Sequence, residues 1–257
     1  MNTLDDLYKV LKTLRDSEKG CAWDKIQTSL SLIPNFIEEV YEAVEAIEAH
    51  SPNDLKEELG DILLHIVFQI QLAEEQHHFT LADVLSNIIN KLIRRHPHIF
   101  ADTEVHNVQE IKLNWEKIKL QEKRGERKSV LDGVPLNMPA LIQAQRIQEK
   151  AAAVGFDWDN LGPVFEKINE EIAEVKDALV QEAGPNLSIE IGDLIFTVVN
   201  LARKLKIDSE TALRSSNKKF ITRFHQVELL AQERNINLHE VSLEVLDELW
   251  EIAKKEY

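Results

Sequence analysis

The sequence has few of the residues that build disulfide-linked, zinc-binding or turn-rich proteins. Cys21 is the only cysteine among 257 residues, which excludes a disulfide framework or a multi-cysteine zinc site within one chain. Glycine and proline number 8 and 7, too few for a fold made of many short strands and tight turns. No stretch approaches the roughly 18 uninterrupted apolar residues of a membrane helix, and no signal peptide is evident, so a cytoplasmic protein is expected.

Positive charge is scarce as well. Lys and Arg total 30 against 45 Asp and Glu, which gives a net charge of −15. Such a surface repels phosphate backbones and anionic lipids, so general affinity for nucleic acid or for a membrane is excluded. Clustered carboxylates are nevertheless well suited to binding a hard cation.

Apolar residues recur at helical spacing through nearly the whole chain, and no strand pattern competes with it. Thr3 and Asp6 form a predicted capping box at the start of the first helix. The expected helices cover 4–14, 34–49, 52–76, 81–95 and 108–122, then 141–153, 164–181, 186–205, 209–234 and 243–254. The segment 124–139 is rich in charge, glycine and proline, so we interpret it as a linker between domains at 1–123 and 140–257.

The two halves are related to each other. EEVYE at 38–42 matches EEIAE at 170–174, and EELGDIL at 57–63 matches IEIGDLI at 189–195. The offset is constant, since 171 − 39 and 190 − 58 both equal 132. A tandem duplication of one helical unit explains this agreement.

Each half carries two pairs of acids, and the members of a pair lie three residues apart on one helix face. The pairs are Glu39 with Glu42 and Glu58 with Asp61, then Glu171 with Glu174 and Glu190 with Asp193. The length of the connection brings both pairs of a half to within about one turn in height on antiparallel helices. Gly60 and Gly192, between the acids, are expected to let the neighbouring helix approach closely.

Four carboxylates at one place need a neutralising charge. Two like charges 4 Å apart repel by roughly 4 kcal/mol at an effective dielectric constant of about 20. All-oxygen ligands select Mg²⁺, Mn²⁺ or Ca²⁺ over zinc, and Mg²⁺ readily shares its shell with substrate phosphates. A solvated acidic helix face is the alternative, but two copies in register favour a metal site. A di-iron centre would require Glu-x-x-His, where this chain has aspartate.

Basic and aromatic residues downstream suit a phosphate ligand. Lys219 and Arg223 lie four residues apart on one helix face, and Lys91 and Arg95 have the same spacing in the first half. Trp250 is a candidate for stacking on a base. Surface ion pairs and an ordinary core tryptophan are the alternatives.

Taken together, these motifs resemble the MazG family of nucleoside triphosphate pyrophosphohydrolases over essentially the whole chain. GCAWDKIQT at 20–28, RRHPHIF at 94–100, VGFDW at 154–158 and NKKFITRF at 217–224 are also similar to family signatures. Ala22 departs from them, since the family usually has proline there. The resemblance implies an all-α fold of two tandem domains of four-helix-bundle type, a homodimer, and magnesium-dependent cleavage of NTP or dNTP to the monophosphate and diphosphate, with Mn²⁺ as a possible substitute.

The resemblance also implies roles for individual residues, chiefly in the second domain. It assigns metal binding to Glu171, Glu174, Glu190 and Asp193, with Glu39, Glu42, Glu58 and Asp61 as a second possible site. It assigns the phosphates to Lys219 and Arg223, with Lys167 as a weaker candidate, and the base to Trp250. Glu170 adjoins a predicted ligand without belonging to the pair, which makes it a candidate general base or else a plain surface glutamate.

Two other functions stay open at this point. A helical binding or scaffolding module would hold metal or nucleotide without turnover. A pyrophosphatase for phosphoribosyl-ATP or dUTP is the other, which the tandem architecture disfavours. A P-loop NTPase is excluded, because GxxxxGK[ST] does not occur.

Overall fold

The computed structural model describes residues 2–101, 129–180 and 184–255, with isolated positions at 105, 107, 110–111, 114–115, 118 and 122. Every regular element within these residues is a helix and none is a strand, so the predicted all-helical class is confirmed. The expected helix at 108–122 lies largely outside the described residues, as do linker positions 124–128. The chain divides into two compact units, 1–123 and 124–257, and we describe each by itself.

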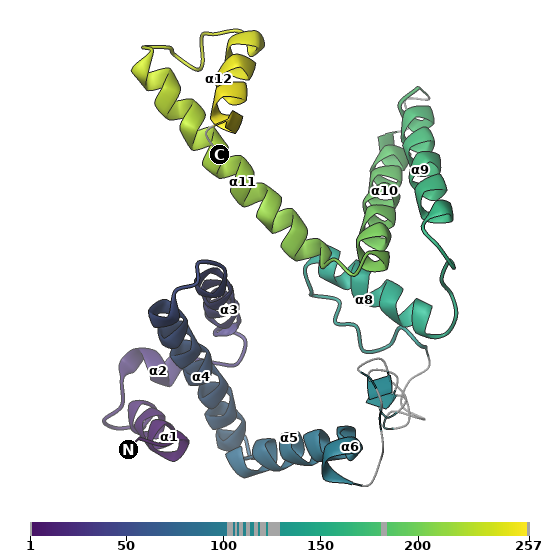
Figure 1. Cartoon of the computed structure of the whole chain (residues 1–257). Coiled ribbons are helices and arrows are strands. Elements are labelled where there is room, and N and C mark those ends of the chain that lie inside the picture. The colour runs from purple at the N-terminus through teal and green to yellow at the C-terminus, as the bar shows by residue number, and fades with distance from the viewer. Residues whose placement is uncertain are drawn as a thin grey trace. The chain divides into compact units, whose positions relative to one another are not determined.

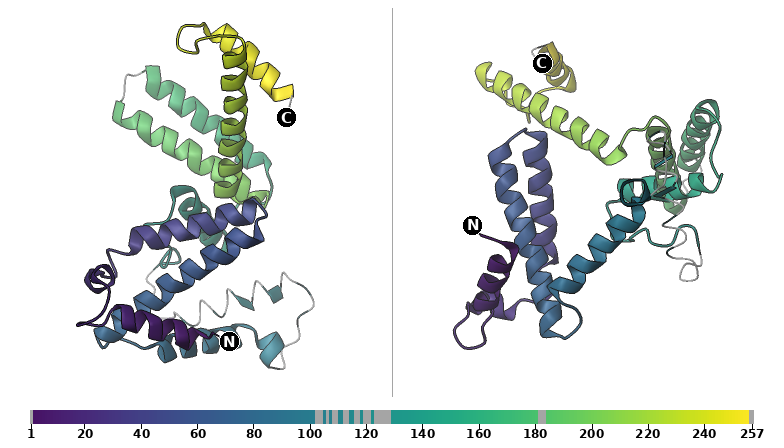
Figure 2. Two further views of the ribbon diagram at one scale, coloured as in Figure 1. Left: turned by 90° about the vertical axis from the view of Figure 1, so that its left-hand side faces the viewer. Right: turned by 60° about the horizontal axis from the view of Figure 1, so that its bottom comes forward.

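An antiparallel hairpin of two helices dominates the first unit. It consists of α3 (Ile33–Glu48) and α4 (Pro52–Glu75), and α1 (Leu4–Leu14) packs against α4 (Figures 1 and 2). The predicted capping box at the start of α1 is confirmed, because the Thr3 hydroxyl accepts a hydrogen bond from the Asp6 backbone N–H and the Asp6 carboxylate accepts one from that of Thr3. The core of this unit consists of Leu11, Leu32, Val67, Phe68 and Leu72.

Three further helices of the first unit lie within the described residues. They are α2 (Ala22–Ile26), α5 (Leu81–Arg95) and α6 (Pro97–Phe100). The sequence predicted α5 with its observed limits but neither α2 nor α6. Those two have 5 and 4 residues, too few to carry a repeating apolar stripe.

The second unit repeats the hairpin and adds a long outer helix. Its helices are α8 (Ala140–Ala153), α9 (Gly162–Val180), α10 (Gly184–Lys204), α11 (Ser209–Glu233) and α12 (Leu243–Lys255). The hairpin is α9 with α10, and α8 packs across α10. From its start beside α8, α11 runs away from the hairpin and pairs with α12 near its far end (Figure 1).

The described part of the predicted linker packs on the second unit. The Lys150 ammonium on α8 donates to the carbonyl oxygens of Val130 and Asp132, at 3.3 and 3.2 Å. Residues 129–139 therefore belong physically with α8. This matters for the site, because Leu131 also lines the pocket described below.

The prediction that two glycines allow a close approach of the neighbouring hairpin helix is wrong in both units. A Cβ added to Gly60 on α4 or to Gly192 on α10 would meet no atom within 4 Å. Neither glycine is therefore needed for the approach of the other hairpin helix.

None of the described helices is long and apolar enough to cross a membrane.

Candidate active site

Carboxylates from both helices of the second hairpin converge. Oxygens of Glu171 and Glu174 on α9 and of Glu190 on α10 all lie within 4.8 Å of one another. The antiparallel pairing of α9 with α10 produces this meeting, since each helix presents its acids on the facing side. Asp193, one turn after Glu190, lines a pocket together with Glu171. The structure thus brings three of the four predicted ligands into one cluster and places the fourth beside it.

Lys167 neutralises part of this charge. Its ammonium lies 2.9 Å from Glu170 Oε1 and 2.9 Å from Glu171 Oε1, one turn along α9. Hydrogen bonds to Glu171 and Glu170 raise the pKa of Lys167, so it stays charged. Burial raises the pKa of Glu174, and Lys167 opposes that shift only in part. One ammonium is therefore insufficient for this group of carboxylates.

The carboxylate charge that Lys167 leaves unneutralised suits a divalent cation. Glu171 is 4% exposed, and its Oε2 is buried without a hydrogen-bond partner. A buried carboxylate oxygen in this state costs free energy until a donor or a cation satisfies it. The other possible metal ligands of this cluster are also carboxylate oxygens, and all-oxygen ligands suit Mg²⁺ or Mn²⁺.

A cavity of about 610 Å³ adjoins the acids. Lys167, Glu171 and Asp193 contribute to its lining, and the rest comes from Leu131, α8, the loop at 154–161 and the later turns of α10. This lining is largely apolar and aromatic, with Trp158 from the loop and Phe196 from α10. The combination of an apolar cavity with adjoining charged groups is typical of small-molecule sites.

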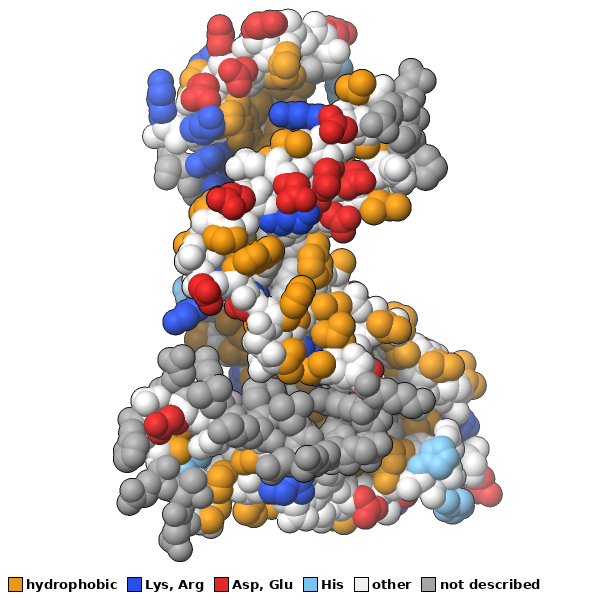
Figure 3. Space-filling model, turned by 90° about the vertical axis from the view of Figure 1, so that its right-hand side faces the viewer, with side chains coloured by type: hydrophobic (Ala, Val, Ile, Leu, Met, Phe, Trp, Pro, Cys, Tyr) orange, Lys and Arg blue, Asp and Glu red, His pale blue; other side chains and the backbone are white. Residues whose placement is uncertain are grey.

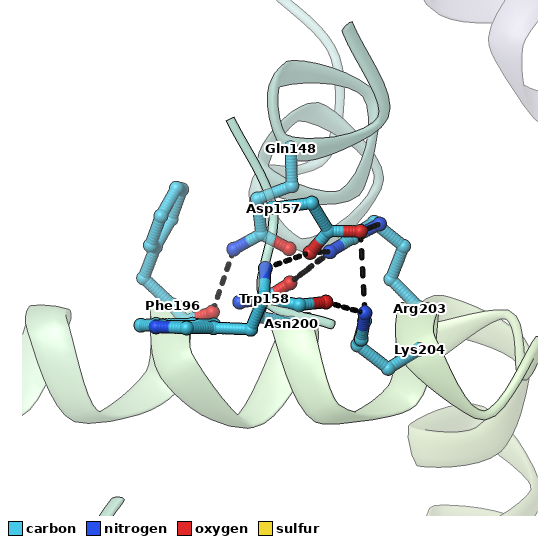
Figure 4. A network of polar contacts seen from close by, with 7 residues as sticks. All are labelled: Gln148, Asp157, Trp158, Phe196, Asn200, Arg203 and Lys204. Carbon is cyan, nitrogen blue, oxygen red and sulfur yellow. Dashed lines mark hydrogen bonds and ion pairs between the residues drawn. The ribbon is translucent and has the colours of Figure 1, made fainter. Parts of the chain in front are cut away.

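Asp157 fastens the loop to α10. Its carboxylate accepts hydrogen bonds from Arg203 at 2.6 and 3.2 Å and from Lys204 at 3.3 Å, and Lys204 also binds the Trp158 carbonyl oxygen (Figure 4). Burial opposes ionisation, yet the bonds to Arg203 and Lys204 hold the pKa of Asp157 below its ordinary value. The ion pairs therefore position one wall of the cavity.

The first unit repeats the acids in a different setting. Oxygens of Glu39, Glu58 and Asp61 lie within 4.8 Å of one another. Burial, followed by the charges of Asp61 and Glu42, raises the pKa of Glu39. The nearby ring of His65 is buried and places Nε2 3.9 Å from Glu39 Oε1.

Two side chains of the second unit's site, Lys167 and Asn200, are replaced in the first unit. At the constant offset of 132, Asn35 corresponds to Lys167, since 167 − 132 = 35, and Phe68 corresponds to Asn200, since 200 − 132 = 68. Phe68 is 3% exposed and belongs to the core. The ammonium beside the acids and the amide in the cavity are thus features of the second unit.

Three predicted substrate contacts lie elsewhere in the second unit. Lys219 and Arg223 are on α11, and Trp250 on α12 packs against Phe220 with ring centroids 5.1 Å apart. None of the three predicted residues is among the described residues that line the cavity. In the first unit, Arg95 forms an ion pair with Glu122.

Several side chains of the cavity wall had no role predicted from the sequence. They are Gln148, Asp157, Asn200 and Arg203. Asp157 lies in the VGFDW motif at 154–158, and Asn200 and Arg203 follow the acidic motif of α10, but only the spatial approach of loop and helix shows what they contact. Gln148 carries no signal in the sequence, since it is one of several polar residues on α8.

Comparison with known proteins agrees with this architecture. The profile of the MazG nucleotide pyrophosphohydrolase domain matches residues 27–100 and 164–228, which contain the two acidic hairpins. The chain is 43% identical over 261 residues to a nucleoside triphosphate pyrophosphohydrolase of Escherichia coli K12, covering 100% of this chain and 98% of that protein. It is 44% identical over 250 residues to the nucleoside triphosphate pyrophosphohydrolase/pyrophosphatase MazG of Thermotoga maritima, covering 97% and 95%. The chain belongs to the MazG family of nucleotide pyrophosphohydrolases.

Proposed function

We propose that this chain cleaves nucleoside triphosphates to the monophosphate and diphosphate, and that the second unit holds the main catalytic site. One observation carries the proposal: the orphaned Glu171 oxygen belongs to an all-carboxylate cluster that adjoins a nucleotide-sized apolar cavity. The names of the full-length relatives point to the same reaction. Nucleotide-pool housecleaning or the control of nucleotide levels is the role expected for it.

The chain's own residues divide the work between holding charge and placing the substrate. Glu171, Glu174, Glu190 and Asp193 would hold Mg²⁺, or Mn²⁺ in its place. The bound ion supplies charge neutralisation for phosphate oxygens and a water of lowered pKa. Lys167 provides a positive charge on the same helix face for those oxygens.

Glu170 remains the proposed general base. Its carboxylate is exposed and adjoins the buried ligand Glu171, so it can accept a proton from a water attacking the α-phosphorus. Lys167 binds Glu170 and so fixes the position of that carboxylate. The diphosphate then leaves with its charge stabilised by basic side chains.

We further propose that the chain is a homodimer and that Lys219, Arg223 and Trp250 approach the acids of a second copy. Within one chain α11 leads away from the hairpin that bears the acids (Figure 1). Exposed apolar side chains occupy these helices, including Ile191 and Ile195 on α10 and Ile221 on α11. Figure 3 shows hydrophobic side chains in the open beside charged ones. Two hairpins paired face to face would bury such residues and form a four-helix bundle, which light scattering tests as a doubled mass.

Removal of single ligands tests the catalytic proposal. We expect Glu174→Ala and Asp193→Ala each to abolish magnesium-dependent release of diphosphate from ATP, GTP, CTP and UTP, because each removes a metal-binding carboxylate. Asp177→Ala is the matched control, since Asp177 is an exposed acid on α9 outside the cluster. Unchanged turnover in the first two variants would refute the assignment of the site to the second unit.

A further inference from the structure

The amide of Gln148 is held in one orientation. Gln148 lies on α8, is 7% exposed, and donates from Nε2 to the carbonyl oxygen of Phe196 at 2.8 Å (Figure 4). A carbonyl oxygen can only accept, so the nitrogen of the amide must face Phe196. Gln148 Oε1 is left buried, in a residue that lines the cavity, with no hydrogen-bond partner.

A second amide on the cavity has the opposite free group. Asn200 Oδ1 accepts hydrogen bonds from Arg203 Nε at 2.9 Å and Arg203 Nη2 at 2.7 Å. The donor group Nδ2 of Asn200 is therefore the part left for a ligand. Gln148 is bonded to the carbonyl oxygen of Phe196, one helical turn before Asn200 on α10, and both amides line the cavity, which therefore presents an acceptor and a donor.

The surroundings of these amides are flat and apolar. Phe156 and Trp158 from the loop and Phe196 from α10 contribute rings to the same lining. Rings favour stacking on a planar heterocycle, while two amides of opposite polarity suit an edge that bears both an N–H and an acceptor. Every nucleobase has such an edge.

The hairpin does not need the Asn200 amide. In the first unit the hairpin forms with Phe68 in the place of Asn200, fully within the core. A buried acceptor without a partner costs free energy, so its presence in the second unit points to a ligand that satisfies it.

We propose that Gln148 Oε1 accepts a hydrogen bond from an N–H group on the edge of the substrate's nucleobase, with Asn200 donating to the same edge. Gln148 is thereby a specificity-determining residue. This inference rests on the proposed function, in which the acids and Lys167 hold the triphosphate end of the nucleotide while the two amides contact its base. The N–H is either an exocyclic amino group, as in adenine and cytosine, or a ring N–H, as in uracil and guanine.

The test replaces Gln148 by a residue of similar length without hydrogen-bonding groups. Gln148→Met in the full chain is compared with Gln143→Met, an equal change on the same helix at a residue whose Nε2 binds the Pro135 carbonyl oxygen outside the cavity. For each protein, kcat/KM is measured with ATP, GTP, CTP and UTP, and with purine riboside triphosphate, which lacks the amino group of adenine. Calorimetry with Mg²⁺ and inorganic triphosphate measures binding of the phosphate chain alone.

We expect Gln148→Met to lower kcat/KM by at least fivefold for the preferred nucleotide, the size of one lost hydrogen bond, and to leave the affinity for inorganic triphosphate unchanged. A lost preference for ATP over purine riboside triphosphate identifies the amino group, and a fall with UTP, whose base has no amino group, identifies the ring N–H. A smaller fall with every nucleotide, or a parallel loss of triphosphate affinity, overturns the inference.

Two controls distinguish a failure of this inference from a loss of the fold or a failure of the proposed reaction. Circular dichroism melting of both variants shows whether Gln148→Met has kept its fold. If wild-type protein releases no diphosphate from any nucleotide, the proposed reaction fails. Nucleotide binding by calorimetry then still decides the role of Gln148, with the same fivefold threshold.

Discussion

Among single residues, Asp157 shows most directly how charge shapes the site. Its carboxylate joins the loop at 154–161 to α10 through Arg203 and Lys204, whose side chains are 12% and 14% exposed. A hydrogen bond to a charged group contributes roughly 1.5–3 kcal/mol to stability, against about 1 kcal/mol for a neutral one. The loop itself has little apolar packing, since Phe156 is 83% exposed. The wall of the cavity therefore depends on ionised Asp157.

This dependence predicts a response to pH. The folded-state pKa of Asp157 lies below its ordinary value of 3.8, so its stabilising effect is complete above that value and is lost as the pH falls through the folded pKa. We expect Asp157→Asn to lower the urea midpoint at about pH 6, and the difference from wild type to shrink below about pH 4. A constant difference down to pH 3 would show that the ion pairs do not stabilise the loop.

At the same scale, the acids were predictable from the sequence and the cavity was not. The spacing of Glu171, Glu174 and Glu190 was sufficient because residues on paired helices meet at predictable heights. The role of Gln148 depends on which carbonyl its amide meets 48 residues away, and no periodicity encodes that contact. Lys167 was only a weak candidate, yet its two ion pairs give it a central place.

Among the elements, long helices were predictable and short ones were not. The limits of α1 and α5 agree with the expected ranges, and the other long helices differ by one or two residues at their ends. Such helices carry several repeats of an apolar stripe. The helix α2 depends instead on its surroundings, including a tight turn at Gly20.

Two glycines of the first unit predict opposite effects on stability. A Cβ at Gly20 would lie 2.4 Å from the Leu14 carbonyl oxygen, whereas one at Gly60 in α4 would meet nothing. We expect Gly20→Ala to lower the melting temperature. We expect Gly60→Ala to raise the free energy of unfolding by about 0.5–1 kcal/mol, because alanine favours the helix. Thermal melting measures both, and destabilisation by Gly60→Ala would indicate that another surface packs against α4.

At the scale of the whole molecule, duplication has given two similar hairpins with unequal sites. Both retain their carboxylates, but only the second unit, among the described residues, combines them with an ammonium and an adjoining polar-edged cavity. The repeat was evident from the sequence. The inequality was not derivable from the acidic motifs, because those are complete in both halves.

The inequality predicts how activity divides between the units. Expressed separately, 124–257 is expected to release diphosphate from nucleoside triphosphates, and 1–123 to release at least a hundredfold less, since it lacks the counterparts of Lys167 and Asn200. The shorter fragment 138–257 should be less active than 124–257, because it loses Leu131 from the cavity and the contacts of Lys150. Equal turnover by the two units would contradict this division.

One helix carries both ends of the site, and this sets a fixed length for whatever binds there. Asp193 and Asn200 are seven residues apart on α10, about 10 Å along its axis. In the proposed nucleotide site, this rigid helix fixes the distance between the group that helps to hold the metal ion and the group that contacts the base. Inserting one residue between the two positions would rotate one side chain by about 100° around the helix axis relative to the other. Asp193 and Asn200 would then no longer face the same cavity, and one nucleotide could not contact both proposed groups.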